Sequence, residues 1–388
     1  MDFEAAVLKQ KDEIIAWRRD FRKNPELSCK EFETQKKIMA LLTGWGLQPK
    51  KAAGTGIIAD IKGALPGKTI AVRADMDALL LQDELDKPYR SANQGVSHAC
   101  GHDGHMAMLL GLAKTLVELQ AELPGTVRFL FQPSEEQLPG GAAPMIAAGA
   151  LESVDYVLGT HVWKDVPSGK VLVLPEAMMA APDEFSIEIQ GRGGHGSLPH
   201  QTVDPIWIGA QIINALKTIT SSLVNPMEHG VVSVGIFKSG DAFNIIPDTA
   251  LIKGTVRTFD DAVRNAIHDH IRKMSSGIAN AMGAQCKVDI IKGYPPVINN
   301  PEVASVVAQA SKEALGEDGL FNMPPVLGAE DFSHYLEKTK GAFFFLGIGN
   351  EAAGSVYPHH HPRFDLDEEM LPKGVEIMLR SIWKLGKQ

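Results

Sequence analysis

Apolar stretches that end in acids or histidines are the feature that most narrows the possible folds of this chain. Strands are expected where such stretches occur, at residues 56–62, 69–75, 126–132 and 156–161. The second of these ends in Asp75, the third runs into Pro133 and a pair of glutamates, and the fourth ends in His161. Helical patterns lie between them. Strands that alternate with helices, with polar groups where the strands stop, predict an α/β sheet whose site lies beyond the strand ends.

Further patterns extend this first domain. Helices are expected around 7–21, from the capping-box spacing of Ser28 and Glu31 to Gly46, from about Ala142 toward the strand at 156, and over 301–315 and 368–385. Residues 342–349 read Ala-Phe-Phe-Phe-Leu-Gly-Ile-Gly, a strand apolar enough to be buried on both faces. We therefore expect a mostly parallel central sheet flanked by helices.

Between residues 182 and 295 the order of the expected elements changes. Strands are expected at 185–190, 231–236, 250–257 and 287–292, and helices at 204–223 and 261–282. The order β-α-β-β-α-β is the ferredoxin-like split motif. A chain of 388 residues is also too long for one ordinary core. We predict a discontinuous domain of residues 1–181 and 295–388, with a smaller domain inserted at 182–294.

The run from His98 to His105 contains three histidines, a cysteine and an aspartate. Cys100 and His102 share one face of an extended segment, whereas on a helix they would point about 200° apart. We therefore expect them on a loop or strand, directly before a helical pattern that starts at Met106. A thiolate and an imidazole near carboxylates form a transition-metal environment. The alternative is an inert cysteine beside incidental histidines, and the density of donors weighs against it.

Five side chains are candidate metal ligands: Cys100, His102, Glu136, His161 and one histidine of His359–His361. Five protein ligands exceed the needs of one zinc ion with an open position, but they suit two metals that share a bridge. The Cys100 thiolate has the lone pairs for that bridge. On extended backbone Glu135 would point away from Glu136, so we expect Glu136 to bind metal and Glu135 to act as general base. A solvated acidic pair is the alternative.

The inserted domain carries three weaker candidates. His195 lies in a glycine-rich, hairpin-like segment, Asn244 precedes Ile-Ile-Pro, and Arg257 closes an expected strand. If they face the metals, His195 could stabilise an oxyanion while Arg257 and Asn244 hold a substrate carboxylate. An arginine at a strand end is otherwise an ordinary solvated charge.

Charge and cysteine usage exclude several classes of protein. The formal net charge of −9 argues against a nucleic-acid binder, which would show a basic face. The three cysteines are widely spaced and odd in number, which favours a reducing, cytoplasmic compartment over a disulfide framework. We expect no signal peptide and no membrane association, because the N-terminus lacks an apolar leader and no run of 18 apolar residues occurs.

Motifs along essentially the whole chain resemble the aminoacylase and carboxypeptidase family of metallopeptidases. Within it, they are similar to the amidohydrolase branch of hippurate hydrolases, indole-acetyl-amino-acid hydrolases and N-acetyl-diaminopimelate deacetylases. The motifs lie at residues 73–78, 98–105, 131–136, 159–163, 191–195, 244–248, 254–257, 328–333 and 361–365. So many motifs in one order make the resemblance specific.

This resemblance implies a catalytic domain with two divalent ions. The ligands would be Cys100, His102, Glu136, His161 and, two residues before Pro362, His360, with Glu135 as general base. Relatives outside the branch have His-x-Asp at 73–75 and a bridging Asp at 100. Asp75 is therefore expected to support the ligands from behind. Mixed sulfur, nitrogen and oxygen ligands accept zinc, manganese, cobalt or nickel, so the metal stays open.

The resemblance also implies a lid domain that contacts substrate and commonly dimerises. His195, Asn244 and Arg257 match substrate-contacting positions, with His195 reaching across a dimer. The helix at 206–223 and the strand at 231–236 are candidate dimer surfaces, unless both only pack within the lid.

The function expected first is hydrolysis of an N-acetyl or N-benzoyl amino acid to a free amino acid and a carboxylic acid. A carboxypeptidase or dipeptidase that acts on short peptides is the nearest alternative. A cysteine-nucleophile hydrolase using Cys100 with His102, and a non-catalytic metal-binding protein, are alternatives from other classes.

Overall fold

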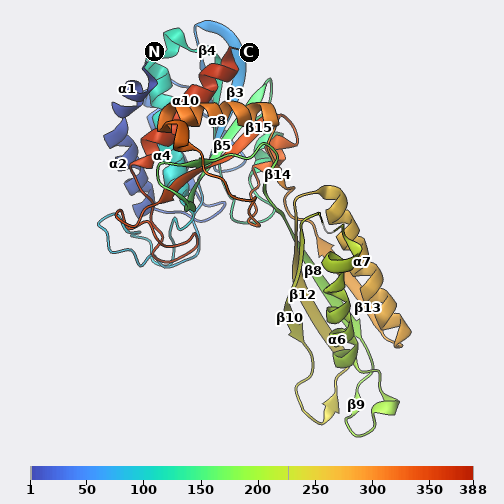
Figure 1. Cartoon of the computed structure of the whole chain (residues 1–388). Coiled ribbons are helices and arrows are strands. Elements are labelled where there is room, and N and C mark those ends of the chain that lie inside the picture. Colours follow the sequence, from blue (N-terminus) through green and yellow to red (C-terminus); the bar gives the residue numbers. More distant parts are fainter. Residues whose placement is uncertain (1, 226, 388) are drawn as a thin grey trace. The chain divides into compact units, whose positions relative to one another are not determined.

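The computed structural model describes residues 2–225 and 227–387. Contacts divide the chain into two compact units (Figure 1). Unit 1 comprises Met1–Met178, Ile298–Pro325 and Asp331–Gln388, and unit 2 comprises Met179–Val297 and Val326–Glu330. Across the described residues, no helix has both the length and the hydropathy that crossing a bilayer requires.

Unit 1 is built on a seven-stranded sheet with the order β1-β2-β4-β3-β5-β15-β6. The strands are β1 (Lys50–Ala52), β2 (Gly56–Lys62), β3 (Leu65–Asp75), β4 (Pro124–Gln132), β5 (Tyr156–Pro167), β6 (Val171–Leu172) and β15 (Lys340–Gly349). Strands β4, β3, β5 and β15 pair in parallel, and the other pairs are antiparallel. The predicted mostly parallel central sheet is confirmed. Phe343–Phe345 are fully buried in β15, as their apolar run predicts.

Helices flank this sheet. They are α1 (Phe3–Leu8), α2 (Lys11–Lys23), α3 (Phe32–Gly44), α4 (His102–Glu118), α5 (Ala142–Ala147), α8 (Pro301–Leu315), α9 (Ser333–Leu336) and α10 (Met370–Gly386), with short 3-10 turns η1 (Gln120–Glu122) and η4 (Glu317–Gly319). The prediction of one helix around residues 7–21 is wrong, because two helices cover this segment. The chain breaks between α1 and α2, where the buried Gln10 donates through Nε2 to Glu118 Oε1 at 2.7 Å.

Unit 2 contains a four-stranded antiparallel sheet with the order β10-β12-β8-β13. Its elements are β8 (Ala181–Gln190), α6 (Pro205–Leu216), β10 (Gly230–Lys238), β12 (Thr249–Thr258), α7 (Asp261–Ala281) and β13 (Gln285–Ile291). This is the β-α-β-β-α-β order that the sequence predicts. Alternate β8 residues Phe185, Ile187 and Ile189 are buried, because one face of the sheet is covered and the other is open.

Shorter elements complete the chain. They are β7 (Ala177–Met179), β9 (Gly194–His195), η2 (Pro199–Gln201), the π-helical turn η3 (Ile219–Leu223), β11 (Ile245–Ile246) and β14 (Val297–Ile298). Strands β9 and β11 pair with each other. The predicted helix at 204–223 is too long: Asp204 caps α6, which ends at Leu216, and η3 follows as a separate turn.

Candidate metal centre

The predicted loop or strand setting is wrong for His102, which is the first residue of α4. Gly101 precedes it with a φ of 98°, a left-handed conformation that favours glycine. A Cβ at Gly101 would lie 2.3 Å from a Val162 methyl, so space also requires glycine there. The turn at Gly101 lets Cys100, in the loop, and His102, in the first helical turn, face one space despite their spacing.

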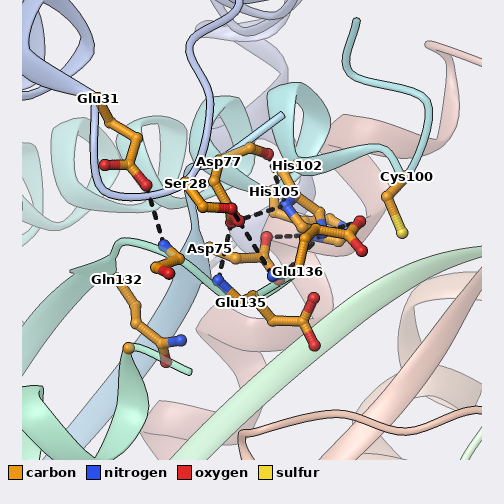
Figure 2. A network of polar contacts seen from close by, with 12 residues as sticks. Ser28, Glu31, Asp75, Asp77, Cys100, His102, His105, Gln132, Glu135 and Glu136 are labelled. Carbon is orange, nitrogen blue, oxygen red and sulfur yellow. Dashed lines mark hydrogen bonds and ion pairs between the residues drawn. The ribbon is translucent and has the colours of Figure 1, made fainter. Parts of the chain in front are cut away.

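Donor atoms from separate segments converge beside this turn (Figure 2). In each of the following groups the ligand atoms lie within 4.8 Å of one another: Cys100, His102 and His161; Cys100, Glu136 and His360; and His102, Glu135 and Glu136. Cys100 belongs to two of these groups. The structure thus brings together all five side chains for which the sequence suggests a ligand role.

Backbone carbonyls orient two of the imidazoles. His102 donates through Nδ1 to the carbonyl oxygen of Asp77 at 2.9 Å, and His161 donates through Nδ1 to the carbonyl oxygen of Val162 at 2.6 Å. Each ring therefore directs its Nε2 toward the shared space, and His161 Nε2 lies 3.4 Å from Cys100 Sγ. The prediction that the strand ends at His161 is wrong, since β5 continues to Pro167.

Two buried atoms that could bind a metal in this space form no hydrogen bond among the described residues. These atoms are His102 Nε2 and Glu136 Oε1, which lie 3.8 Å apart. Buried polar atoms rarely lack a hydrogen bond in folded proteins, so a buried imidazole nitrogen and a buried carboxylate oxygen that face each other without one suit a shared cation. The donor set of sulfur, nitrogen and oxygen therefore fits a transition metal.

The charge of the space also favours a cation. Burial opposes the charged imidazole, but Asp75, followed by Asp77, raises the pKa of His102 to about 10. Burial raises the pKa of the Cys100 thiol well above its ordinary value, and the Glu136 and Glu135 carboxylates add to this effect. Negative charge clustered in the space thus raises the pKa of His102 and adds to the effect of burial on Cys100, and a divalent ion would neutralise this charge.

Of the three consecutive histidines, His360 is the one that faces the shared space. Its Nε2 lies 3.3 Å from Glu136 Oε1, its φ is 63°, and its amide donates to the carbonyl of Ala99 at 2.8 Å. His359 is turned instead toward Trp163, with ring centroids 4.8 Å apart, and His361 stacks on Tyr357.

Asp75 lies behind the donors in a fully buried cluster. Its Oδ1 accepts from His105 Nδ1 and its Oδ2 accepts from Arg73 Nη1, both at 2.6 Å. The amide of Val162 donates to His105 Nε2 at 2.9 Å, and Asp75 Oδ2 lies 3.6 Å from His102 Nε2. Sequence reasoning gave His105 no role, although it lies in the same histidine-rich run.

Glu135 and Glu136 do not lie on the extended backbone that the sequence analysis assumed, because β4 ends at Gln132 and the chain bends through them. Both carboxylates therefore lie on the side of His102, rather than on opposite sides. The amides of Glu135 and Glu136 each donate to the carboxylate of Asp77 at 3.0 Å. Sequence reasoning gave Asp77 no role, and its place two residues after Asp75 at a strand end was the available signal.

His195, Asn244 and Arg257 belong to unit 2. His195 in β9 pairs with Ile245, and the amide of Gly196 donates to the carbonyl of Asn244 at 2.8 Å, so the exposed His195 and Asn244 are neighbours. Arg257 lies near the end of β12, whose first residue is Thr249. The two residues are about 26 Å apart along the strand. That Arg257 and Asn244 hold a substrate carboxylate stays a prediction.

Comparisons with known proteins place the chain in a family. The model of peptidase family M20/M25/M40 matches residues 71–384. Thermostable carboxypeptidase 2 of Saccharolobus solfataricus is 44% identical over 95% of this chain and 94% of its own. N-acyl-L-amino acid amidohydrolase of Geobacillus stearothermophilus is 45% identical over 78% of this chain and 82% of its own.

A solved structure extends the likeness to three dimensions. The YXEP protein of Bacillus subtilis, a dinuclear metal-binding peptidase of the M20 family, has a TM-score of 0.84 and 35% identity, covering 97% of this chain and 99% of its own. The chain belongs to peptidase family M20/M25/M40.

Proposed function

We propose that the protein is a metal-dependent amidohydrolase that cleaves N-acyl amino acids, such as N-acetyl or N-benzoyl derivatives, to a free amino acid and a carboxylic acid. The observation that carries the proposal is the pair of unpaired buried donors, His102 Nε2 and Glu136 Oε1, beside the Cys100 thiol. Relatives named as an N-acyl-L-amino acid amidohydrolase and an N-acetylcysteine deacetylase support this substrate class.

Two divalent ions, of zinc, manganese, cobalt or nickel, would bind between the donor groups that share Cys100. His102 and His161 would hold one ion, Glu136 and His360 the other, with the Cys100 thiolate between them. When bound, such a pair supplies a water of lowered pKa and polarises the scissile carbonyl. The solved relative that is named a dinuclear metal-binding peptidase supports two ions rather than one.

Glu135 would act as general base. Its amide is held by Asp77, while its carboxylate lies within 4.8 Å of the donor atoms of His102 and Glu136. A carboxylate at that distance can take a proton from water and return it to the leaving nitrogen. Glu136, next to it, would remain a ligand.

Unit 2 would act as a lid and dimerisation domain, corresponding to residues 182–294. We propose that this domain forms a homodimer in which His195 reaches the site of the other subunit. Arg257 with Asn244 would hold the substrate carboxylate, and His195 of the partner subunit would stabilise the oxyanion. Strand β10 is a sheet edge with Ile236 and Phe237 exposed, which supports its role as a dimer surface.

A metallo-carboxypeptidase or dipeptidase is the second candidate, because Saccharolobus solfataricus relatives of 43–44% identity are named carboxypeptidases. A cysteine-nucleophile hydrolase is disfavoured, since burial and nearby carboxylates raise the pKa of the Cys100 thiol and suppress the thiolate in the absence of a metal. All three cysteines are free, which supports a cytoplasmic location.

The test is turnover of the metal-reconstituted protein on N-acetyl amino acids, N-benzoyl amino acids and dipeptides. We expect the acylated amino acids to be preferred and EDTA to abolish activity. Glu135→Ala should bind metal normally but lose at least about 10³-fold in kcat, whereas Glu351→Ala, at an exposed position, should behave as wild type. Activity in EDTA, or wild-type kcat for Glu135→Ala, would contradict the proposal.

A further inference from the structure

We propose that Glu31 is a positioning residue for Glu135 and Glu136. The inference rests on the proposed roles of these two glutamates as base and ligand. Glu31 is fully buried and directly precedes α3. It lies 103 residues before Ser134, whose amide donates to Glu31 Oε1 at 2.9 Å. Figure 2 shows Glu31 beside the loop that carries the two glutamates.

The same oxygen of Glu31 accepts two amides from residues with left-handed backbone. Cys29 has a φ of 62° and donates at 3.1 Å, and Ser134 has a φ of 55° and donates at 2.9 Å. For residues other than glycine this conformation costs roughly 1–3 kcal/mol, and it persists only where surrounding contacts require it. A shared carboxylate acceptor is such a contact, because hydrogen bonds to an ionised group are strong.

These two turns fix the loop from both sides. After Ser134, the amides of Glu135 and Glu136 donate to Asp77, so three consecutive amides each meet a carboxylate oxygen. Next to Cys29, the hydroxyl of Ser28 donates to Asp77 Oδ2 at 2.6 Å. Glu31 therefore constrains the direction of both glutamates directly through Ser134 and indirectly through Ser28.

The role depends on a group with two acceptor oxygens and no donor. Thr55 Oγ1 donates to Glu31 Oε2 at 2.5 Å, while both amides use Oε1. A glutamine at 31 keeps the size of the side chain, but its neutral oxygen is a weaker acceptor for the two amides. Its NH₂ group can turn toward the Thr55 hydroxyl, which is able to accept a hydrogen bond. Thr55→Val removes the hydroxyl and leaves Oε1 with its two amides, which makes it a matched control.

The experiment compares Glu31→Gln with Thr55→Val in the metal-loaded enzyme. Both variants should lose thermal stability. Only Glu31→Gln should lower kcat, by about 10- to 100-fold, with KM changed by less than about threefold, because a small displacement of catalytic groups acts on the chemical step. Hydrogen exchange of the amides at 134–136 in the metal-free protein should quicken in Glu31→Gln and stay unchanged in Thr55→Val.

Two results would overturn the inference: wild-type kcat and exchange for Glu31→Gln, or equal losses of kcat in the two variants. The proposed function fails separately. If Glu135→Ala kept its turnover, the base assignment would be wrong, while hydrogen exchange would still report whether Glu31 holds the loop.

Discussion

Two buried clusters in this molecule consist of the same three residue types and differ in what surrounds them. In unit 1, Asp75 accepts from Arg73 and His105, each at 2.6 Å. In unit 2, Asp183 accepts from His268 Nε2 at 2.6 Å and from Arg264 through both carboxylate oxygens. By composition and distance alone, the clusters would be assigned the same role.

The difference lies in the neighbouring atoms. The cluster in unit 2 is closed by the backbone of Gly293, whose amide donates to Asp183 at 2.9 Å and whose carbonyl accepts from Arg264 at 3.0 Å. Asp75 instead lies 3.6 Å from His102 Nε2, one of the buried atoms without a partner. These two clusters therefore differ in the buried atoms without a hydrogen bond beside one of them, and not in their buried charges.

The largest effect is expected from Asp183→Asn. This change leaves the buried Arg264 without its carboxylate, and removing one partner of a buried pair costs about 3–5 kcal/mol of unfolding free energy. Urea unfolding of wild type and variant measures the loss. Metal affinity should be unchanged, since every side-chain bond of this cluster lies within unit 2. A large loss of metal affinity would break the distinction between the clusters.

Asp75→Asn should show the opposite pattern. Asp75 orients His105 and lies beside His102, and changing a residue that supports metal ligands typically weakens affinity about 10- to 100-fold. Competition with a chromophoric chelator measures the affinity, with Asp183→Asn as the matched buried carboxylate. Equal affinity of the two variants would show that Asp75 is only a structural partner of Arg73.

Elements with a strong local signal could be predicted from the sequence. Helix α8 begins at Pro301 after the Asn300 cap, and both signals lie within a few neighbouring residues. The buried strand at 342–349 was equally clear because no polar residue interrupts its apolar run. Four candidate ligands could be named because donors of the right type are dense around Cys100 and at strand ends, whereas His360 was chosen from three consecutive histidines by the family resemblance alone.

Features that depend on one torsion angle or on distant contacts could not be predicted. His102 was expected outside a helix because spacing rules do not reveal the left-handed turn at Gly101. Glu31 was noted only as part of a capping pattern, and its contact with Ser134 spans 103 residues. The pairing of His195 with Ile245 in unit 2 joins segments that lie 50 residues apart, which no local pattern encodes.

The smallest expected effect is a pH dependence of stability. Burial opposes ionisation of Asp183, but Arg264, His268 and the Gly293 amide hold its pKa well below its ordinary range. As pH falls below about 4, the unfolded chain therefore binds a proton before the folded one does. The stabilisation is present above this pH and is lost as pH falls through the folded pKa, by at most about 1.4 kcal/mol per pH unit.

Urea unfolding of metal-free protein at a series of pH values between about 5 and 2 measures this slope. Asp183→Asn should lower the slope of unfolding free energy against pH by up to the equivalent of one proton taken up on unfolding, because asparagine does not titrate. Asp75 also has a pKa well below its ordinary range, since burial is outweighed by His102, His105 and Arg73. Asp75→Asn should therefore flatten the slope in the same way, although only that variant loses metal affinity. Similar slopes with different metal affinities would show that the two clusters share their electrostatics and differ in function through the unpaired donors beside one of them.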